Sequence, residues 1–412
     1  DILSFGKIRA AYGRTGSDAG PYNTNATYGQ ASYSGVYGNG IARFPMNATN
    51  SFRRGSSIPS TTLRPEMTTE FEVGANLRFL NGRIGIDAAY YNRLTTDQIF
   101  SISIDPSTGY TGMVYNAGDV SNKGVELLFD FIPVQTRDFR WDVSINWAKN
   151  FSKVLDLPEE VSDGKLLVDG FSTSAAKDRV NFYIEKGQPY GTYWTYLPTY
   201  TKDGKLIADQ YGQPVMTDEV EPTGFDANYK WTGGLSTSLT YKSLTLSANL
   251  DVRVGGKMFS RTKNITEFTG NSIITEYNDR QPFVIPNSVV YDAETKQYVE
   301  NTTPIYLYNS SLQNYFDDYG AGQGRLFYLV DRSFVKLRNI SLSYDLPKKW
   351  IGPLSGVSLS AYVNNAFTWT AKDNYFVDPE FTNQGTDRGG LFGETYVNPA
   401  CRIWGFNLNV KF

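Results

Sequence analysis

Several segments of the chain alternate strictly between apolar and polar residues. In 70–80 an apolar side chain falls at every second position from Phe71 to Phe79, and polar or small residues separate them. The same period of two recurs along the chain, in 83–94, 124–131, 138–147, 231–242, 244–254, 357–364 and 402–412. Side chains of a β-strand point alternately to opposite faces, so this pattern predicts strands with one apolar and one polar face.

The length of these runs and the charges on their polar faces indicate which kind of β protein this is. The runs last about 10–13 residues, whereas strands of soluble proteins usually have about 5–6 residues and a tilted membrane strand needs about 9–11. The polar faces carry charges such as Arg78, Asp87 and Asp142, which a wet barrel interior accepts and a dry sandwich core does not. We therefore expect an all-β fold, a transmembrane antiparallel β-barrel, rather than a soluble sandwich or propeller.

The connections between the runs have two very different lengths. Asn81-Gly82 joins two alternating runs and is a type I′ hairpin signal, and Thr136–Asp138 and Lys242-Ser243 are similarly short. Other connections are long, at about 14–69, 100–122, 260–325 and 371–400. Outer-membrane barrels have short periplasmic turns and long extracellular loops, so we expect the long connections to form the extracellular surface.

The number of strands follows from the direction in which each run must travel. Strands are counted forwards from the Asn81-Gly82 turn and backwards from the C-terminus. Between the two counts only one clear strand remains, at about 188–200, although alternating strand directions require two there. We therefore expect a second, less obvious strand between 151 and 228, which gives about 12 strands in all.

Composition excludes several classes of function. The chain of 412 residues has 39 Lys+Arg against 42 Asp+Glu, a net charge of −3, and so offers no basic surface for nucleic acid. It contains no histidine and a single cysteine, Cys401, which removes His-based catalysis, most His-built zinc sites and disulfide frameworks. We expect no enzyme activity, no metal and no cofactor. Acidic pairs such as Asp218-Glu219 could serve as glycosidase carboxylates, but nothing in the sequence positions them, and we interpret them as solvated loop charges.

Longer stretches of the sequence resemble one family. They include Asn81-Gly82-Arg83, the segment NAGDVSNKGVE at 116–126, the segment FVKLRNISL at 334–342 and Asp378-Pro379-Glu380. These segments resemble, in family order, the C-terminal barrel of SusC-like (SusC/RagA) TonB-dependent outer-membrane transporters. The resemblance implies that 1–412 is the C-terminal part of a TonB-dependent receptor β-barrel. It also implies a larger barrel of about 22 strands, with a plug domain that this chain does not contain.

The resemblance also implies a function and a location. Members of the SusC-like family reside in the outer membrane of Gram-negative bacteria and import glycan or peptide oligomers as part of a SusC/SusD-type complex. The implied partners are a SusD-like surface lipoprotein, the TonB complex acting through the missing N-terminal part, outer-membrane lipid and the oligomeric substrate. The alternative is a surface-exposed glycan-binding or adhesin barrel without import.

Aromatic and charged residues of the long loops are the candidates for substrate contact. Aromatic rings stack on sugars and peptides, and carboxylates or guanidinium groups hydrogen-bond hydroxyls and amides. On this basis we predict substrate contacts from two loops, 260–325 and 371–400, through Tyr277, Tyr315, Phe316, Asp317, Asp318, Tyr319, Tyr375 and Arg388. Ordinary packing of the loops is the alternative explanation for the same residues.

Overall fold

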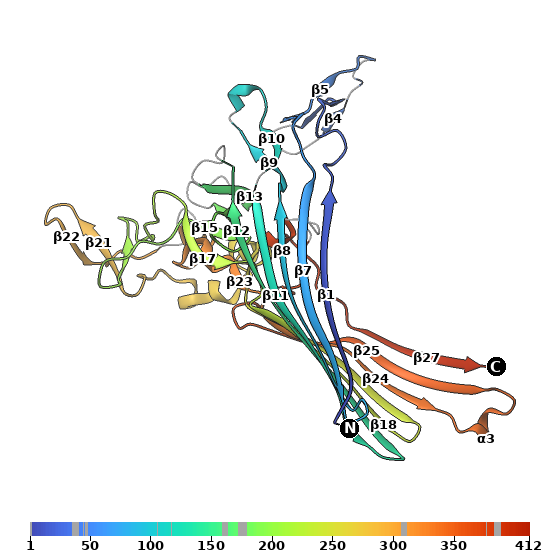
Figure 1. The fold of residues 1–412 in the computed structure, drawn as a ribbon. Helices are drawn as coiled ribbons and strands as arrows, with labels where there is room; N and C mark the ends of the chain where they lie inside the picture. Colours follow the sequence, from blue (N-terminus) through green and yellow to red (C-terminus); the bar gives the residue numbers. More distant parts are fainter. Residues whose placement is uncertain are drawn as a thin grey trace.

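The main feature of the computed structural model is one curved sheet of ten long antiparallel strands (Figure 1). The structure describes residues 2–34, 41–43, 45, 48–104, 106–116, 118–158, 164–171, 179–305, 311–375, 377–382 and 389–412. The sheet strands follow one another in the order of the chain: β1 (Leu3–Ser17), β7 (Glu66–Phe79), β8 (Ile84–Thr96), β11 (Asp119–Gln135), β12 (Phe139–Asp156), β18 (Trp231–Tyr241), β19 (Leu244–Val254), β24 (Phe334–Asp345), β25 (Gly356–Thr370) and β27 (Ile403–Lys411). The predicted all-β fold is confirmed, and the sheet forms part of a barrel wall.

The alternation of the sequence sets the register of the sheet. Apolar residues pair with apolar residues on one face, as Phe129 does with Ile86 and Ile145. On the other face, which we call the polar face, polar groups bond across strands. Arg9 of β1 reaches past β7 to Asp87 of β8, with 2.8 Å between the guanidinium and the carboxylate. The guanidinium passes over Gly74, where a Cβ would lie 2.6 Å from Arg9 Cζ, so this crossing requires glycine.

Short turns lie at one end of the sheet and long connections at the other (Figure 1). The predicted hairpin turn has left-handed backbone at Asn81 (φ 56°) and Gly82 (φ 84°), as a type I′ turn requires. At the next turn, the Thr136 amide donates to the Phe139 carbonyl over 2.7 Å. Among the described residues, the short connections contain one helix, α3 (Lys348–Ile351), in the connection from β24 to β25.

The structure corrects the predicted number of strands. β12 pairs directly with β18, so the sheet has ten strands rather than about twelve. The segment 157–230 is one more long connection, and it forms a separate small sheet of β13 (Lys165–Phe171), β14 (Val180–Glu185), β15 (Thr192–Thr195) and β17 (Glu221–Asp226). The apolar run at 188–200 therefore contains β15 and no barrel strand. The directions of the strands are satisfied because β12 ends and β18 begins at the same end of the sheet.

The remaining elements belong to the long connections. The first two connections contain β2 (Tyr28–Gln30), β3 (Ser32–Ser34), β4 (Ile41–Arg43), β5 (Phe52–Arg54), β6 (Ser57–Ile58), β9 (Ile99–Ser103), η1 (Pro106–Thr108) and β10 (Gly112–Asn116). The others contain β16 (Leu206–Ala208), β20 (Lys257–Ser260), α1 (Arg261–Phe268), η3 (Ile273–Arg280), β21 (Ser288–Asp292), β22 (Gln297–Glu300), α2 (Ser311–Asp317), η5 (Gly324–Tyr328), β23 (Leu329–Asp331), α4 (Gly389–Phe392) and β26 (Gly393–Glu394). Among the described residues, no helix has the length and apolar character needed to cross a membrane.

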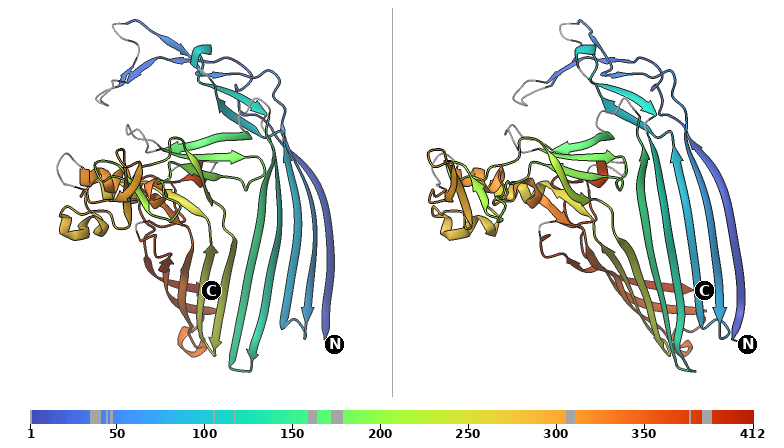
Figure 2. Two further views of the ribbon diagram at one scale, coloured as in Figure 1. Left: turned by 90° about the vertical axis from the view of Figure 1, so that its left-hand side faces the viewer. Right: turned by 60° about the vertical axis from the view of Figure 1, so that its left-hand side comes forward.

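Three of the long connections, 157–230, 255–333 and 371–402, share one hydrophobic core, which we call the loop core. Figure 2 shows that these connections lie together at one end of the sheet. The rings of Phe259 and Phe392 stack with their centroids 5.3 Å apart, and Phe182 packs on Tyr193 at 4.9 Å. The Tyr193 hydroxyl lies 2.7 Å from the carbonyl oxygen of Phe392 and 3.1 Å from that of Lys257. These connections therefore fold as one body at the loop end of the sheet.

Candidate functional site

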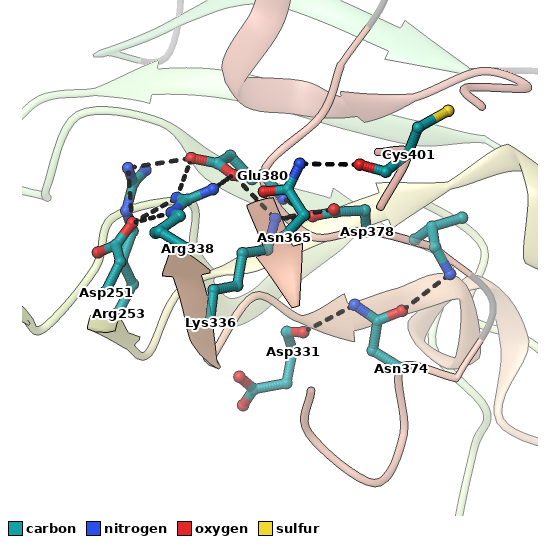
Figure 3. A network of polar contacts seen from close by, with 11 residues as sticks. Asp251, Arg253, Asp331, Lys336, Arg338, Asn365, Asn374, Asp378, Glu380 and Cys401 are labelled. Atoms are coloured by element: carbon teal, nitrogen blue, oxygen red, sulfur yellow. Dashed lines mark hydrogen bonds and ion pairs between the residues drawn. The ribbon is translucent and has the colours of Figure 1, made fainter. Parts of the chain in front are cut away.

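Where the loop body meets the polar face of the sheet, six charged side chains form an ion network (Figure 3). We call it the loop-anchoring network. The wall contributes Asp251 and Arg253 of β19 and Lys336 and Arg338 of β24, and the last long connection contributes Asp378 and Glu380.

Lys336 is the most buried member of this network, with its side chain 2% exposed. Its ammonium group lies 2.6 Å from an Asp378 carboxylate oxygen and 2.8 Å from Glu380 Oε2. Glu380 also accepts from Arg338 over 2.6 Å and from Arg253 over 3.3 Å. One carboxylate of the loop therefore binds three cations of the wall.

Local backbone features bring these charges together. Asp378 accepts the backbone N–H of Glu380 over 3.1 Å, which turns the two acidic side chains toward the wall. The pairing of β24 with β25 shifts its register between Leu337 and Asn339, a bulge that leaves Arg338 on the polar face beside Lys336. Burial raises the pKa of Glu380, but the hydrogen bonds from Arg338 and Lys336 outweigh it and lower the pKa to about 2. Glu380 is thus ionised at neutral pH.

A cavity of ≈ 370 Å³ lies beside this network, and we call it the arginine cavity. It is lined by wall residues of the polar face, including Tyr91, Asn150 and Arg253, and by Tyr229 and Arg332 from the connections. Small-molecule sites usually measure about 300–1,000 Å³, so the cavity can accept one unit of an oligomer. Arg253 belongs to both features and joins the network to the cavity.

The structure places the predicted contact residues in different environments. Tyr315 and Phe316 are 7% and 3% exposed and pack in a cluster with Phe283, and burial raises the pKa of Tyr315 to about 12. Tyr319 is half-buried against the same cluster. Such burial leaves Tyr315 and Phe316 little surface for a ligand, and contact of Tyr319 with substrate stays a prediction.

The other candidates are more accessible or charged. Tyr277 and Tyr375 are exposed by 50% and 59%, and contact of both with substrate stays a prediction. Asp317 and Asp318 face Arg325, each at 3.6 Å, so these acids stabilise the loop body. Arg388 lies outside the described residues.

Reasoning from the sequence missed two residues of the arginine cavity, Tyr229 and Arg332. Each lies two residues before a wall strand, at the end of a long connection. No pattern in the sequence distinguishes them from other loop residues, because their proximity arises from the pairing of β18, β19 and β24. Arg253 was accessible to prediction, since the alternation of 244–254 places it on the polar face.

Comparison with known proteins gives matches along the whole chain. A family model described as "TonB dependent receptor-like, beta-barrel" matches residues 3–215. The chain is 23% identical over 434 aligned residues to TonB-dependent receptor P3 of Formosa agariphila, covering 98% of this chain and 39% of that protein. It is 24% identical over 366 aligned residues to TonB-dependent receptor SusC of Bacteroides thetaiotaomicron, covering 85% of this chain and 32% of that protein. The chain thus spans about two fifths or less of these relatives.

Solved structures show the same fold. The RagAB peptide transporter superposes with a TM-score of 0.69 at 19% identity, covering 100% of this chain and 41% of that one. The RagAB peptide importer in its 'open-open' state gives a TM-score of 0.64 at 20% identity, with 40% of its chain covered. The likeness extends over the wall strands and over the long connections that fold on them.

Proposed function

Because the chain belongs to the family of TonB-dependent receptor-like β-barrels, we propose that it forms the C-terminal barrel portion of a SusC-like importer in the outer membrane. The imported compounds are glycan or peptide oligomers. The observation that carries this proposal is the superposition of the entire chain, loops included, on a barrel described as a peptide transporter. An adhesin would need no likeness to a transporter across both its wall and its loops.

The two faces of the sheet support a role in passage across the membrane. The apolar face suits lipid, with side chains such as Phe406 exposed by 89%, while the polar face carries ion pairs suited to a hydrated interior. The loop body lies at one end of this polar face, where an entering oligomer would first make contact (Figure 2). The loop-anchoring network fixes that body to the wall.

The proposal includes partners that this chain does not contain. A SusD-like surface lipoprotein would cover the loop end and retain the oligomer, and the TonB complex would supply energy through another part of the transporter. The name of the relative SusC and the likeness to the RagAB peptide transporter support this arrangement.

Uptake by living cells tests the proposal. A strain lacking the complete gene is compared with the same strain carrying a restored copy, using fluorescent oligosaccharides and peptides of matched length. We expect uptake only in the restored strain and its loss when a protonophore removes the energy source. Surface binding that persists in the presence of the protonophore, with no label in the periplasm at any time, would instead favour the adhesin.

Lipoprotein association is measured on the same restored strain. An affinity-tagged transporter should co-purify with a surface lipoprotein in stoichiometric amount. Import without any such partner would retain the transporter and remove the SusD-like lid from the proposal.

A further inference from the structure

We infer that the arginine cavity binds a carboxylate group of the imported oligomer, and that this oligomer is an acidic saccharide. This inference rests on the proposed import function and names the class of substrate. It is carried by the charge of the cavity, by two buried donors without acceptors, and by the paired state of the strands that form its wall.

One positive charge of the cavity has no counter-charge within 4.0 Å among the described residues. The three cations and three carboxylates of the loop-anchoring network compensate one another. Arg332 lies outside that network, and no carboxylate of the described residues comes within 4.0 Å of its guanidinium. Among the described residues that line the cavity, none is Asp or Glu. An incoming anion would therefore meet a positive guanidinium and no like charge.

Two of the residues that line this space have a buried donor without a hydrogen-bond acceptor in the described part of the chain: Arg332 at Nε and Tyr229 at its hydroxyl. Other contacts hold both groups in place. Arg332 donates through NH1 to the Ala227 carbonyl over 3.1 Å. The guanidinium carbons of Arg332 and Arg253 lie 4.9 Å and 5.4 Å from the centroid of the Tyr229 ring. Buried donors without partners are costly, and a carboxylate has two oxygens that would accept from both.

The wall of the cavity favours a saccharide over a peptide. Peptides are often recognised by adding a strand to an open sheet edge, but β12, β18 and β19 are each paired on both sides. The cavity instead offers the rings of Tyr91 and Trp231. The lining amides of Asn150 and Asn228 are already bonded within the protein. Rings that stack suit the face of a sugar ring.

Binding to the complete transporter in detergent tests the inference. The probes are a galacturonate tetrasaccharide, a neutral galactose tetrasaccharide and a capped tetraglutamate peptide. The variants are Arg332→Gln and Tyr229→Phe, and Arg137→Gln serves as the matched control because Arg137 is exposed in a turn at the other end of the sheet. Each variant is first checked for wild-type amounts of heat-modifiable protein. Tyr229→Phe removes only one oxygen atom, so it keeps the test open should Arg332→Gln not assemble.

The expected result is that wild type prefers the galacturonate probe and that Arg332→Gln weakens its binding by about tenfold or more. Tyr229→Phe should weaken it by a smaller factor, and Arg137→Gln should not change it. Equal binding of the neutral and acidic saccharides, unchanged in both cavity variants, would overturn the carboxylate site while leaving import intact. Binding of tetraglutamate alone, dependent on Arg332, would overturn the saccharide. If wild-type cells take up none of the oligomers, the proposed function itself is contradicted.

Discussion

Replacing Glu380 with glutamine tests whether the loop-anchoring network holds the last long connection against the wall. The substitution keeps the shape of the side chain and removes its charge, so Lys336, Arg338 and Arg253 lose one of the carboxylates that they share. Lys336 cannot turn to water because its side chain is 2% exposed. Leaving a buried charge without a partner costs about 3–5 kcal/mol, and this is an upper bound here because Lys336 keeps its contact with Asp378 over 2.6 Å.

The pKa of Glu380 leads to a similar magnitude. The folded structure lowers it from 4.5 to about 2, and a difference of this size corresponds to about 3 kcal/mol of stability at pH 7. Because the folded value is the lower one, this stability is present above pH 4.5 and is lost as the pH falls toward 2. The glutamine variant should lack both the stability and its dependence on pH.

Hydrogen–deuterium exchange of the complete transporter in detergent measures the effect. At neutral pH we expect protection of 377–382 to fall by about two orders of magnitude in Glu380→Gln, since 1.4 kcal/mol corresponds to tenfold. Glu300→Gln is the control, because it makes the same chemical change on an exposed strand of the loop body. Protection within twofold of wild type would refute the anchoring role.

A double variant shows whether the loss arises at the ion pair itself. Lys336→Met removes the buried cation, so Glu380→Gln should cost less in its presence than in wild type, with a coupling of about 1–3 kcal/mol. Strictly additive effects would mean that the two residues stabilise the loop independently.

Three further substitutions have defined expectations. Leu246→Arg on the apolar face should cost about 2–4 kcal/mol and reduce folded protein in the outer membrane, measured as the heat-modifiable band, whereas Thr245→Arg on the polar face should not. Tyr193→Phe should lower the free energy of opening of all three connections of the loop core by about 1–3 kcal/mol, measured by hydrogen exchange, because the Tyr193 hydroxyl lies 2.7 Å from the Phe392 carbonyl oxygen. An effect confined to one connection would contradict this. Burial raises the pKa of Glu267 to about 8. The folded state therefore holds a proton that the unfolded state releases, and stability should fall as the pH rises from 4.5 to 8. Melting temperatures across this range should show that decline in wild type and not in Glu267→Gln.

The sheet was predictable because each of its strands is encoded by a local pattern in the sequence. Each wall strand contacts lipid on one side and a hydrated interior on the other, so alternation with a period of two marks both the strand and its register. The Asn81-Gly82 turn is local as well. The segment 157–230 was misread because β15 also alternates, with Tyr193 buried in the loop core and Trp194 on the other side. Alternation reports a two-faced environment, and it does not distinguish lipid from a protein core.

The candidate site was less predictable for a related reason. Aromatic residues in loops serve both ligand contact and packing, and composition does not separate these roles. Tyr315 and Phe316 pack inside the loop body, while Tyr229 lies in the arginine cavity without any distinguishing pattern nearby. Charge balance distinguishes Arg332 from the other cations, and this balance is visible only when the partners of every neighbouring charge are known.

The loop core also determines how the function of the long connections can be examined. Phe259, Tyr328 and Phe392 lie in one cluster with Tyr193, although they come from different connections. Deleting 371–400 removes Phe392 and would therefore expose apolar rings of the remaining connections, so a loss of import after that deletion would not locate the substrate. Substitutions that preserve the core, such as Tyr229→Phe, avoid this problem. The same packing constrains how the long connections can move relative to the wall. If the connections move, they move as one body, and separation of that body from the wall breaks the bonds of Glu380 to Lys336 and Arg338. The strength of the loop-anchoring network should thus set how easily these connections separate from the wall.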